Sequence, residues 1–327
     1  MKEIFKSLKK ILPVLGLVLF FYLIYTSDLE KIKTIIISMN PALLIIALIL
    51  TLPRTLLRNY AWQIIQKEQN IDIKYWESLK IFFIGFFYCS ITPGYIGHLM
   101  RVPYLKEHTR QPYGKLFVNT LIETIVHSIS LYILISIGLI LVIDLAPETR
   151  NITVIWILWI IVNIIVIYYF INKNRGEKLL YNLIKIVIIK KLSKNLKSFI
   201  STFYTDFPNI KKLITPLLIG IVTWIIAFTQ EYMFVISFGI NIPYIYFIFL
   251  FPIANIIGFI PVTFAGIGTR EATAILIFTT LFTNVSKEEI LLVSLFGFLT
   301  VDVFTGLIGF ILSLTEAKDV KNYFLIR

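Results

Sequence analysis

Two short stretches decide the fold: CSITPGYIGHLMR at residues 89–101 and GFIPVTFAGIGTRE at residues 258–271. Each places a proline and two glycines before an arginine, within strongly apolar sequence. Proline and glycine interrupt helices, and an interrupted helix at membrane depth is tolerated only where it lines a cavity or is buried in protein. We therefore interpret both stretches as interruptions that serve a site.

Composition points to a membrane protein. Hydrophobic residues make up 57% of the 327 residues, which is too many for a soluble globular protein. The net charge of +12 is then better explained by a lysine excess on the cytoplasmic side and by attraction to anionic lipids than by nucleic-acid binding. One cysteine and three histidines without ligand spacing predict no disulfide, no metal and no cofactor.

The apolar runs predict six full transmembrane helices and two shorter excursions. Residues 81–92, and the pair 244–260 and 271–283, are each too short for a comfortable crossing. We interpret them as re-entrant hairpins, because only then does the basic segment 172–212 share the cytoplasmic side with both termini. The six spans are Ile11–Thr26, Pro41–Ile65, Leu116–Asp144, Ile152–Ile171, Leu213–Phe238 and Glu289–Leu314.

The order span, span, hairpin, span occurs twice and predicts an inverted repeat of residues 1–145 and 146–327. The first copy starts inside and the second outside, as in many transporters. In this frame TPGYIGHLMR and TFAGIGTR align, so that Gly97 matches Gly268 and Arg101 matches Arg270. The basic segment 172–212 between the halves predicts an amphipathic helix on the cytoplasmic leaflet.

The two interruptions predict an anion site. A half-helix that begins inside the membrane leaves unpaired backbone N–H groups, and glycines let a ligand approach them. Arg101 and Arg270 could offer forked donors to a phosphate or carboxylate, and Glu271 could hold Arg270 when no substrate is bound. The candidate headgroup-binding residues are Pro93, Gly94, Gly97, Arg101, Gly266, Gly268, Arg270 and Glu271.

Two further arginines lie in the second predicted span. Arg54 is the deeper of the two, and we expect it to face the cavity. For Arg58, facing the cavity and reaching back to the interface remain equally open.

Four other ionisable residues lie within predicted spans, where an unpaired charge is costly. For Glu123 and Glu231 we expect pairing with arginines rather than a role in proton coupling. Asp302, in the middle of the last span, is the better candidate for a proton relay. His127 follows Glu123 by four residues, which predicts a hydrogen bond between the two.

Both interruptions resemble motifs of the transmembrane, flippase-like region of lysylphosphatidylglycerol synthases and their stand-alone relatives. The first family motif runs like Pro-Gly-x-x-Gly-Glu-x-x-Arg and the second like Pro-Gly-Gly-x-Gly-x-Arg-Glu. PGYIGHLMR matches the first, with His98 in place of the acidic residue, and FAGIGTRE matches the second, with Phe264 and Ala265 in place of Pro-Gly. LIETIV around Glu123 resembles the family's acidic position after the first hairpin.

The resemblance implies a stand-alone integral-membrane member without the synthase domain, and not an enzyme. It implies a lipid flippase in the cell membrane, moving an aminoacyl-phosphatidylglycerol or a polyprenyl- or dolichyl-phosphate-linked sugar between leaflets. The expected partners are membrane lipids and not nucleic acid, and an oligomer is compatible with the sequence. Two alternatives remain open: a secondary transporter of a small soluble anion, and a membrane enzyme that acts on a lipid phosphate.

Overall fold

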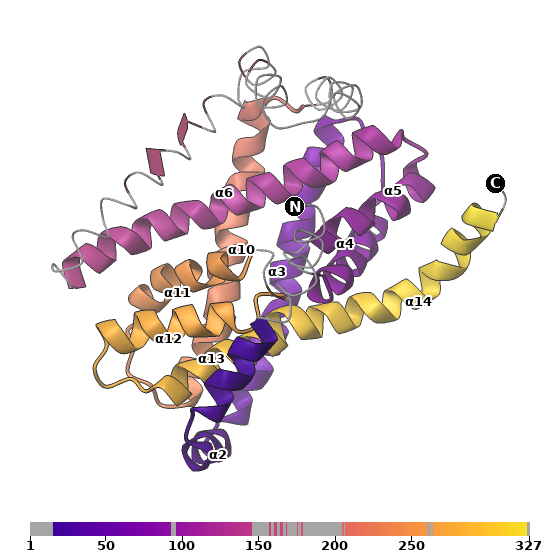
Figure 1. Cartoon of the computed structure of the whole chain (residues 1–327). Helices are drawn as coiled ribbons and strands as arrows, with labels where there is room; N and C mark the ends of the chain where they lie inside the picture. The colour runs from indigo at the N-terminus through magenta and orange to yellow at the C-terminus, as the bar shows by residue number, and fades with distance from the viewer. Residues whose placement is uncertain are drawn as a thin grey trace, which may run out of the picture.

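The structure, a computed structural model, describes residues 16–92, 96–145, 207–259, 263 and 265–325, with isolated positions from 157 to 205. Every regular element in this part of the chain is a helix, which confirms the all-α prediction (Figure 1). Most of the predicted span Ile152–Ile171 and of the linker 172–212 lies outside the described residues, as do residues 11–15, Pro93, Gly94 and Phe264.

Four described helices are long and apolar enough to cross a membrane, and they match four of the six predicted spans. A helix of 28 residues extends about 42 Å, more than the roughly 30 Å of a bilayer's hydrocarbon core. Residues Gly16–Tyr25 form a shorter apolar helix within the first predicted span. The long elements are α3 (Pro41–Glu68), α6 (Tyr113–Leu145), α10 (Ile210–Ser237), and α13 (Lys287–Phe298), which continues through the π-helical turn η3 (Leu299–Val303) into α14 (Phe304–Leu325).

Local sequence sets where three of these helices begin. The Asn40 side chain accepts a hydrogen bond from the backbone N–H of Ala42, and a proline occupies the first helical position of α3. Asn209 caps α10 in the same way. Ser286 and Glu289 form a capping box at the start of α13.

Two helical hairpins separate the long helices. The first is α4 (Tyr75–Ser90), the 3₁₀ turn η1 (Ile96–Met100) and α5 (Arg101–Thr109); the second is α11 (Tyr244–Gly258) and α12 (Thr269–Leu281). His108 near the end of α5 lies 3.9 Å from Glu77 at the start of α4. The rings of Tyr246 in α11 and Phe282 after α12 are 6.0 Å apart, so each hairpin returns to the level at which it starts.

The helices α3 and α10 form an antiparallel pair at the centre of the molecule (Figure 1). At one end the backbone N–H of Asn40 donates to Ser237 Oγ over 2.9 Å. At the other end Lys212 lies 3.3 Å from Glu68. Between them the Gln230 side chain donates to the carbonyl oxygen of Ala47 over 2.6 Å. Polar contacts along the whole length therefore fix the register of this pair.

Each hairpin packs on a long helix far from it in the sequence. The helix α4 lies along α14, and α11 lies along α6. Glycine makes both contacts close, since a Cβ on Gly309 would collide with the carbonyl oxygen of Phe83, and one on Gly138 with that of Phe249. The two contacts have the same form, and Gly309 is a packing residue, as its place in an apolar helix predicts.

Alanine at Gly309 or Gly138 is expected to destabilise the fold by about 1–3 kcal/mol, the usual cost of overpacking a close contact. The control is Gly306→Ala in the same helix, where the new Cβ would lie 2.9 Å from Ser90 Oγ, a side-chain atom that can rotate away. Thermal unfolding in detergent measures the effect. Equal melting temperatures for Gly309→Ala and Gly306→Ala would show that the contact is not as close as described.

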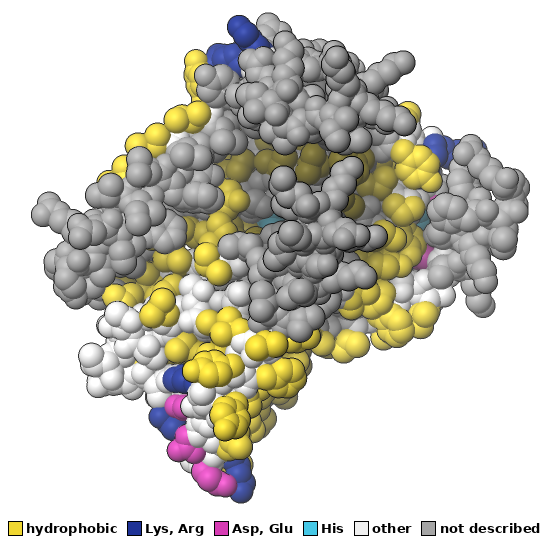
Figure 2. Space-filling view, in the orientation of Figure 1, with side chains coloured by type: hydrophobic (Ala, Val, Ile, Leu, Met, Phe, Trp, Pro, Cys, Tyr) yellow, Lys and Arg dark blue, Asp and Glu magenta, His cyan; other side chains and the backbone are white. Residues whose placement is uncertain are grey.

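Hydrophobic side chains cover most of the described surface in Figure 2, whereas charged side chains gather around α2 (Leu29–Ile37). On α3, the side chains of Ile45, Ile49 and Leu52 are more than half exposed. So much exposed apolar surface suits contact with lipid. The protein is therefore a multi-pass helical membrane protein.

Candidate functional site

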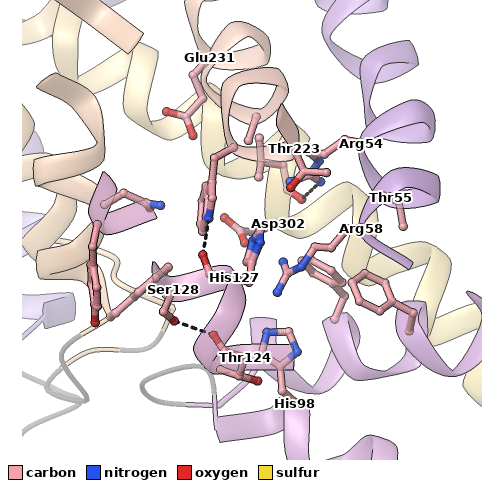
Figure 3. Close-up of a pocket in the computed structure, with 18 residues that line it drawn as sticks. Arg54, Thr55, Arg58, His98, Thr124, His127, Ser128, Thr223, Glu231 and Asp302 are labelled. Atoms are coloured by element: carbon pink, nitrogen blue, oxygen red, sulfur yellow. Dashed lines mark hydrogen bonds between the residues drawn. The ribbon is translucent and has the colours of Figure 1, made fainter. Parts of the chain in front are cut away.

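A cavity of about 290 Å³ lies where the two hairpins meet the central pair of helices. Both halves of the chain contribute to its wall, and in Figure 3 the side chains of Arg58, Asp302 and His98 converge on it. Its polar and charged lining residues are Arg54, Thr55, Arg58, His98, Thr124, His127, Ser128, Thr223, Glu231, Asn255 and Asp302. Its aromatic lining residues are Phe82, Phe86, Tyr132, Trp224 and Phe259.

The arginine of the first motif lies behind this wall. Arg101 begins α5, is fully buried, and donates from Nη1 to Glu123 Oε2 over 2.9 Å. Its Nη2 lies 2.7 Å from His98 Nδ1, and its guanidinium stacks 4.1 Å from the centre of the Phe82 ring. Gly85 makes room for it, because a Cβ there would collide with the arginine side chain. Packing and hydrogen bonds together hold this cation in place.

Glu123 is shared between two arginines. Its Oε1 accepts from Arg58 Nε over 3.2 Å, while its Oε2 accepts from Arg101. The expected pairing of Glu123 is therefore confirmed, and Arg58 is drawn to the cavity rather than to the interface. Its guanidinium also lies 5.2 Å from the centre of the Phe86 ring. Two cations and one anion leave a net positive charge on this side of the cavity.

The predicted hydrogen bond between His127 and Glu123 is wrong. The His127 ring stacks on Trp224, with ring centroids 4.5 Å apart and planes 14° apart. Trp224 also donates from Nε1 to the backbone oxygen of His127 (Figure 3). A spacing of four residues allows the two side chains to meet, but an aromatic partner 97 residues away competes for the imidazole.

The arginine of the second motif is held by its neighbour. Arg270, in the first turn of α12, contacts Glu271 Oε1 over 2.8 Å, as the sequence predicts. It also donates to Ser294 Oγ over 3.1 Å, and Ser294 in turn donates to Glu271 Oε1. Glu271 Oε2 accepts from the backbone N–H of Gly268, which offsets the cost of an arginine at a helix N-terminus.

The π-helical turn brings two more charges to the cavity. Asp302 lies in this turn, with Oδ2 3.7 Å from Arg270 Nη1. Arg54 faces the cavity, as expected, and donates from Nη2 to the carbonyl oxygen of Val301 and to Thr305 Oγ1, each over 2.9 Å. Such turns widen a helix locally and occur often at functional sites.

Glu231 differs from the other acidic residues of the site. It lines the cavity from α10 with 3% of its surface exposed, and its Oε2 has no hydrogen-bond partner. The expected ion pair with an arginine is not formed among the described residues, because Arg270 and Arg54 are engaged by other groups. Gly297 leaves the space into which the Glu231 side chain extends.

The motif glycines that the structure describes do not line the cavity. Gly97 packs on the backbone of Tyr88, Gly266 on Gly258, and Gly268 on Gly16. Gly266 and Gly268 have φ values of +78° and +89°, which also favour glycine. Of the eight predicted headgroup-binding residues, the six described ones are not among those that line the cavity, and their role as ligands stays a prediction.

A family model for the lysylphosphatidylglycerol synthase TM region matches residues 11–309, most of the chain. This chain belongs to that family. A search of curated proteins finds no match to it. In this family member, the two motifs provide the buried arginines behind the cavity, whereas four residues from long helices and the π-helical turn supply the charges of the wall: Arg54, Arg58, Glu231 and Asp302.

Several residues of this lysylphosphatidylglycerol synthase TM-region protein carry no signal in the sequence. Ser294 and Gly85 contact the motif arginines only through tertiary packing. Trp224 and Asn255 enter the cavity wall from apolar stretches in which neither residue breaks the hydropathy pattern strongly. Only an arginine or carboxylate in an apolar run is costly enough to stand out in a single sequence.

Proposed function

We propose that this protein moves a lipid with an anionic headgroup between the two leaflets of the cell membrane. The observation that carries the proposal is the arginine-lined cavity among membrane helices, near the turns of both hairpins. Membership of a family built on the transmembrane region of a lipid synthase supports a lipid as substrate. The lipid is an aminoacyl-phosphatidylglycerol or a polyprenyl- or dolichyl-phosphate-linked sugar, and the protein is a transporter rather than an enzyme.

The headgroup phosphate binds between Arg54 and Arg58. Both line the cavity, and Arg54 Nε is buried without a hydrogen-bond partner. An unpaired buried donor is costly and favours an acceptor from a ligand. Arg101 and Arg270 lie behind the wall and become available when Glu123 and Glu271 release them. The aromatic part of the wall suits a sugar ring or the first carbons of the lipid.

The halves 1–145 and 146–327 form an inverted repeat whose hairpins enter from opposite sides. The reciprocal packing of α4 on α14 and of α11 on α6 supports this arrangement. At about 24 Å each, α4 and α11 also end short of a full crossing.

Charge supports termini on the cytoplasmic side. Among the described residues, the end of the molecule at which Lys212 meets Glu68 carries eight basic and five acidic residues. The opposite end carries three basic and four acidic ones. The positive-inside rule assigns the first end to the cytoplasm. The residues of the first end are Lys67, Glu68, Asp72, Lys74, Glu77, Lys80, Lys106, Glu107, Arg110, Lys115, Lys211, Lys212 and Glu316. Those of the second are Asp28, Glu30, Lys31, Lys33, Lys287, Glu288 and Glu289.

Transport of a small soluble anion is the second candidate. The cavity volume of about 290 Å³ suits a headgroup or a free organic phosphate, but not a pair of acyl chains. In this case the same arginines bind the ligand from water rather than from the bilayer.

Reconstitution into vesicles tests the lipid proposal. Vesicles with fluorescent phosphatidylglycerol in both leaflets are treated with an impermeant reductant that bleaches the outer leaflet. With active protein, bleaching is expected to pass the half of the signal that empty vesicles lose. Bleaching that stops at half, together with uptake of radiolabelled glycerophosphoglycerol, would favour the soluble anion instead.

A further inference from the structure

Glu231 is the starting point, because it is a buried carboxylate aimed into a cavity with one oxygen unpartnered. Each of the other three acidic residues of the site contacts an arginine: Glu123 at 2.9 Å, Glu271 at 2.8 Å and Asp302 at 3.7 Å. A carboxylate that is buried without a partner is costly when charged and far less so when it carries a proton.

The charges that face Glu231 come from several elements. Arg54 on α3, Arg270 and Glu271 on α12, and Asp302 in η3 all act on it electrostatically. From α6, His127 lines the same cavity, while α11 contributes the neutral Asn255. On α13, Gly297 packs against the Glu231 side chain.

The site is balanced in formal charge. It holds four arginines, Arg54, Arg58, Arg101 and Arg270, and four acidic residues, Glu123, Glu231, Glu271 and Asp302. A ligand with one net negative charge, such as a polyprenyl-phosphate-linked sugar, would therefore bring one uncompensated negative charge into a buried site, which is expensive in a low dielectric. One added proton restores the balance, and Glu231 is the acceptor whose protonation breaks no ion pair.

We propose that Glu231 is a proton-binding site that is filled when an anionic ligand enters the cavity, so that anion and proton bind together. The inference rests on the proposed function, since it concerns the same cavity. Binding is reciprocal: the anion favours protonation of Glu231, and the proton favours the anion by the same factor. A proton gradient across the membrane then drives net movement of the anion, which supplies an energy source for the transporter.

Calorimetric titration of the detergent-purified full chain tests the proposal. The probes are dihexanoyl phosphatidylglycerol and its soluble headgroup glycerophosphoglycerol, phosphodiesters that carry one negative charge throughout the pH range used. Titration in two buffers of different ionisation enthalpy gives the number of protons taken up per ligand bound.

At a pH high enough for Glu231 to be charged in the ligand-free protein, the wild type is expected to take up about one proton per bound lipid. Its affinity should fall about tenfold per pH unit where Glu231 is charged, which is the slope of one linked proton. Glu231→Gln mimics the protonated form and should bind without proton uptake and independently of pH. Glu231→Asp keeps a carboxylate and should therefore retain the proton uptake. It provides the test if the Gln variant fails to fold. Glu288→Gln, at the start of α13 and away from the cavity, is the matched control and should behave as wild type.

The two probes separate this inference from the proposed function. Lipid binding without proton uptake, or with uptake that persists in Glu231→Gln, would overturn the role of Glu231 and leave lipid transport standing. Binding of glycerophosphoglycerol alone, with one proton, would overturn the lipid substrate and retain the proton site. Binding of neither probe would contradict both.

Discussion

Glu123→Gln is expected to destabilise the protein by about 3–5 kcal/mol, the usual cost of removing one partner from a buried ion pair. The carboxylate holds both Arg58 and Arg101, so an uncharged amide leaves two neighbouring guanidinium groups without their shared counter-charge, and that of Arg101 is fully buried. Arg101 has no exposed surface through which water could compensate it. Thermal unfolding in detergent should show a large fall in melting temperature, with poor recovery of folded protein.

The double variant Glu123→Gln/Arg101→Gln is the control. It removes one charge of each sign, so the cluster keeps the single positive charge of the wild type. We expect it to recover much of the lost stability. A double variant as unstable as the single one would show that the shape of the Glu123 side chain matters more than its charge.

Arg54→Gln/Arg58→Gln is expected to reduce lipid transport by at least about 100-fold. Hydrogen bonds to charged groups contribute about 1.5–3 kcal/mol each, so loss of two removes about 3 kcal/mol or more from headgroup binding. The fold should persist, because Glu123 keeps its pair with Arg101 and glutamine can still donate to the carbonyl oxygen of Val301. The bleaching assay in vesicles measures the rate.

Arg110→Gln is the matched control for this prediction. Arg110 is an exposed arginine that caps α5 in a left-handed conformation, remote from the cavity lining. The Arg110→Gln variant should transport lipid at the same rate as the wild type. Unchanged transport in the Arg54→Gln/Arg58→Gln variant, with the protein folded, would contradict the proposed place of the headgroup.

The long helices were predictable because a helix that crosses a bilayer needs a minimum length of apolar residues, and such a run is visible in a single sequence. Four predicted spans match described helices, and the interruptions at residues 89–101 and 258–271 fall where each hairpin turns. Hydropathy does not give the depth of a helix in the bilayer or its partners. The packing of α4 on α14 therefore has no counterpart in the sequence pattern, apart from glycines such as Gly309.

The candidate site was predictable where a residue breaks a local rule. Arg270 at a helix N-terminus and Glu123 in an apolar run are examples, and both lie at the site. The side chain that each charged or aromatic residue contacts was less predictable, because the contacting residues lie far apart in the chain. His127 stacks on Trp224 rather than bonding Glu123, and Glu231 lacks the expected arginine because Arg270 is already held by Glu271 and Ser294.

The contacts at Gly309 and Gly138 have a mechanical consequence. At both contacts the nearest atoms of the neighbouring helix belong to its backbone, which leaves little room to absorb a displacement. A tilt of α14 must therefore carry α4 with it, and a tilt of α6 must carry α11. Each hairpin is therefore coupled to a long helix far from it in the sequence, and we expect neither hairpin to move alone. If the protein is the transporter proposed above, such coupling is expected to keep the cavity from opening to both sides of the membrane at once.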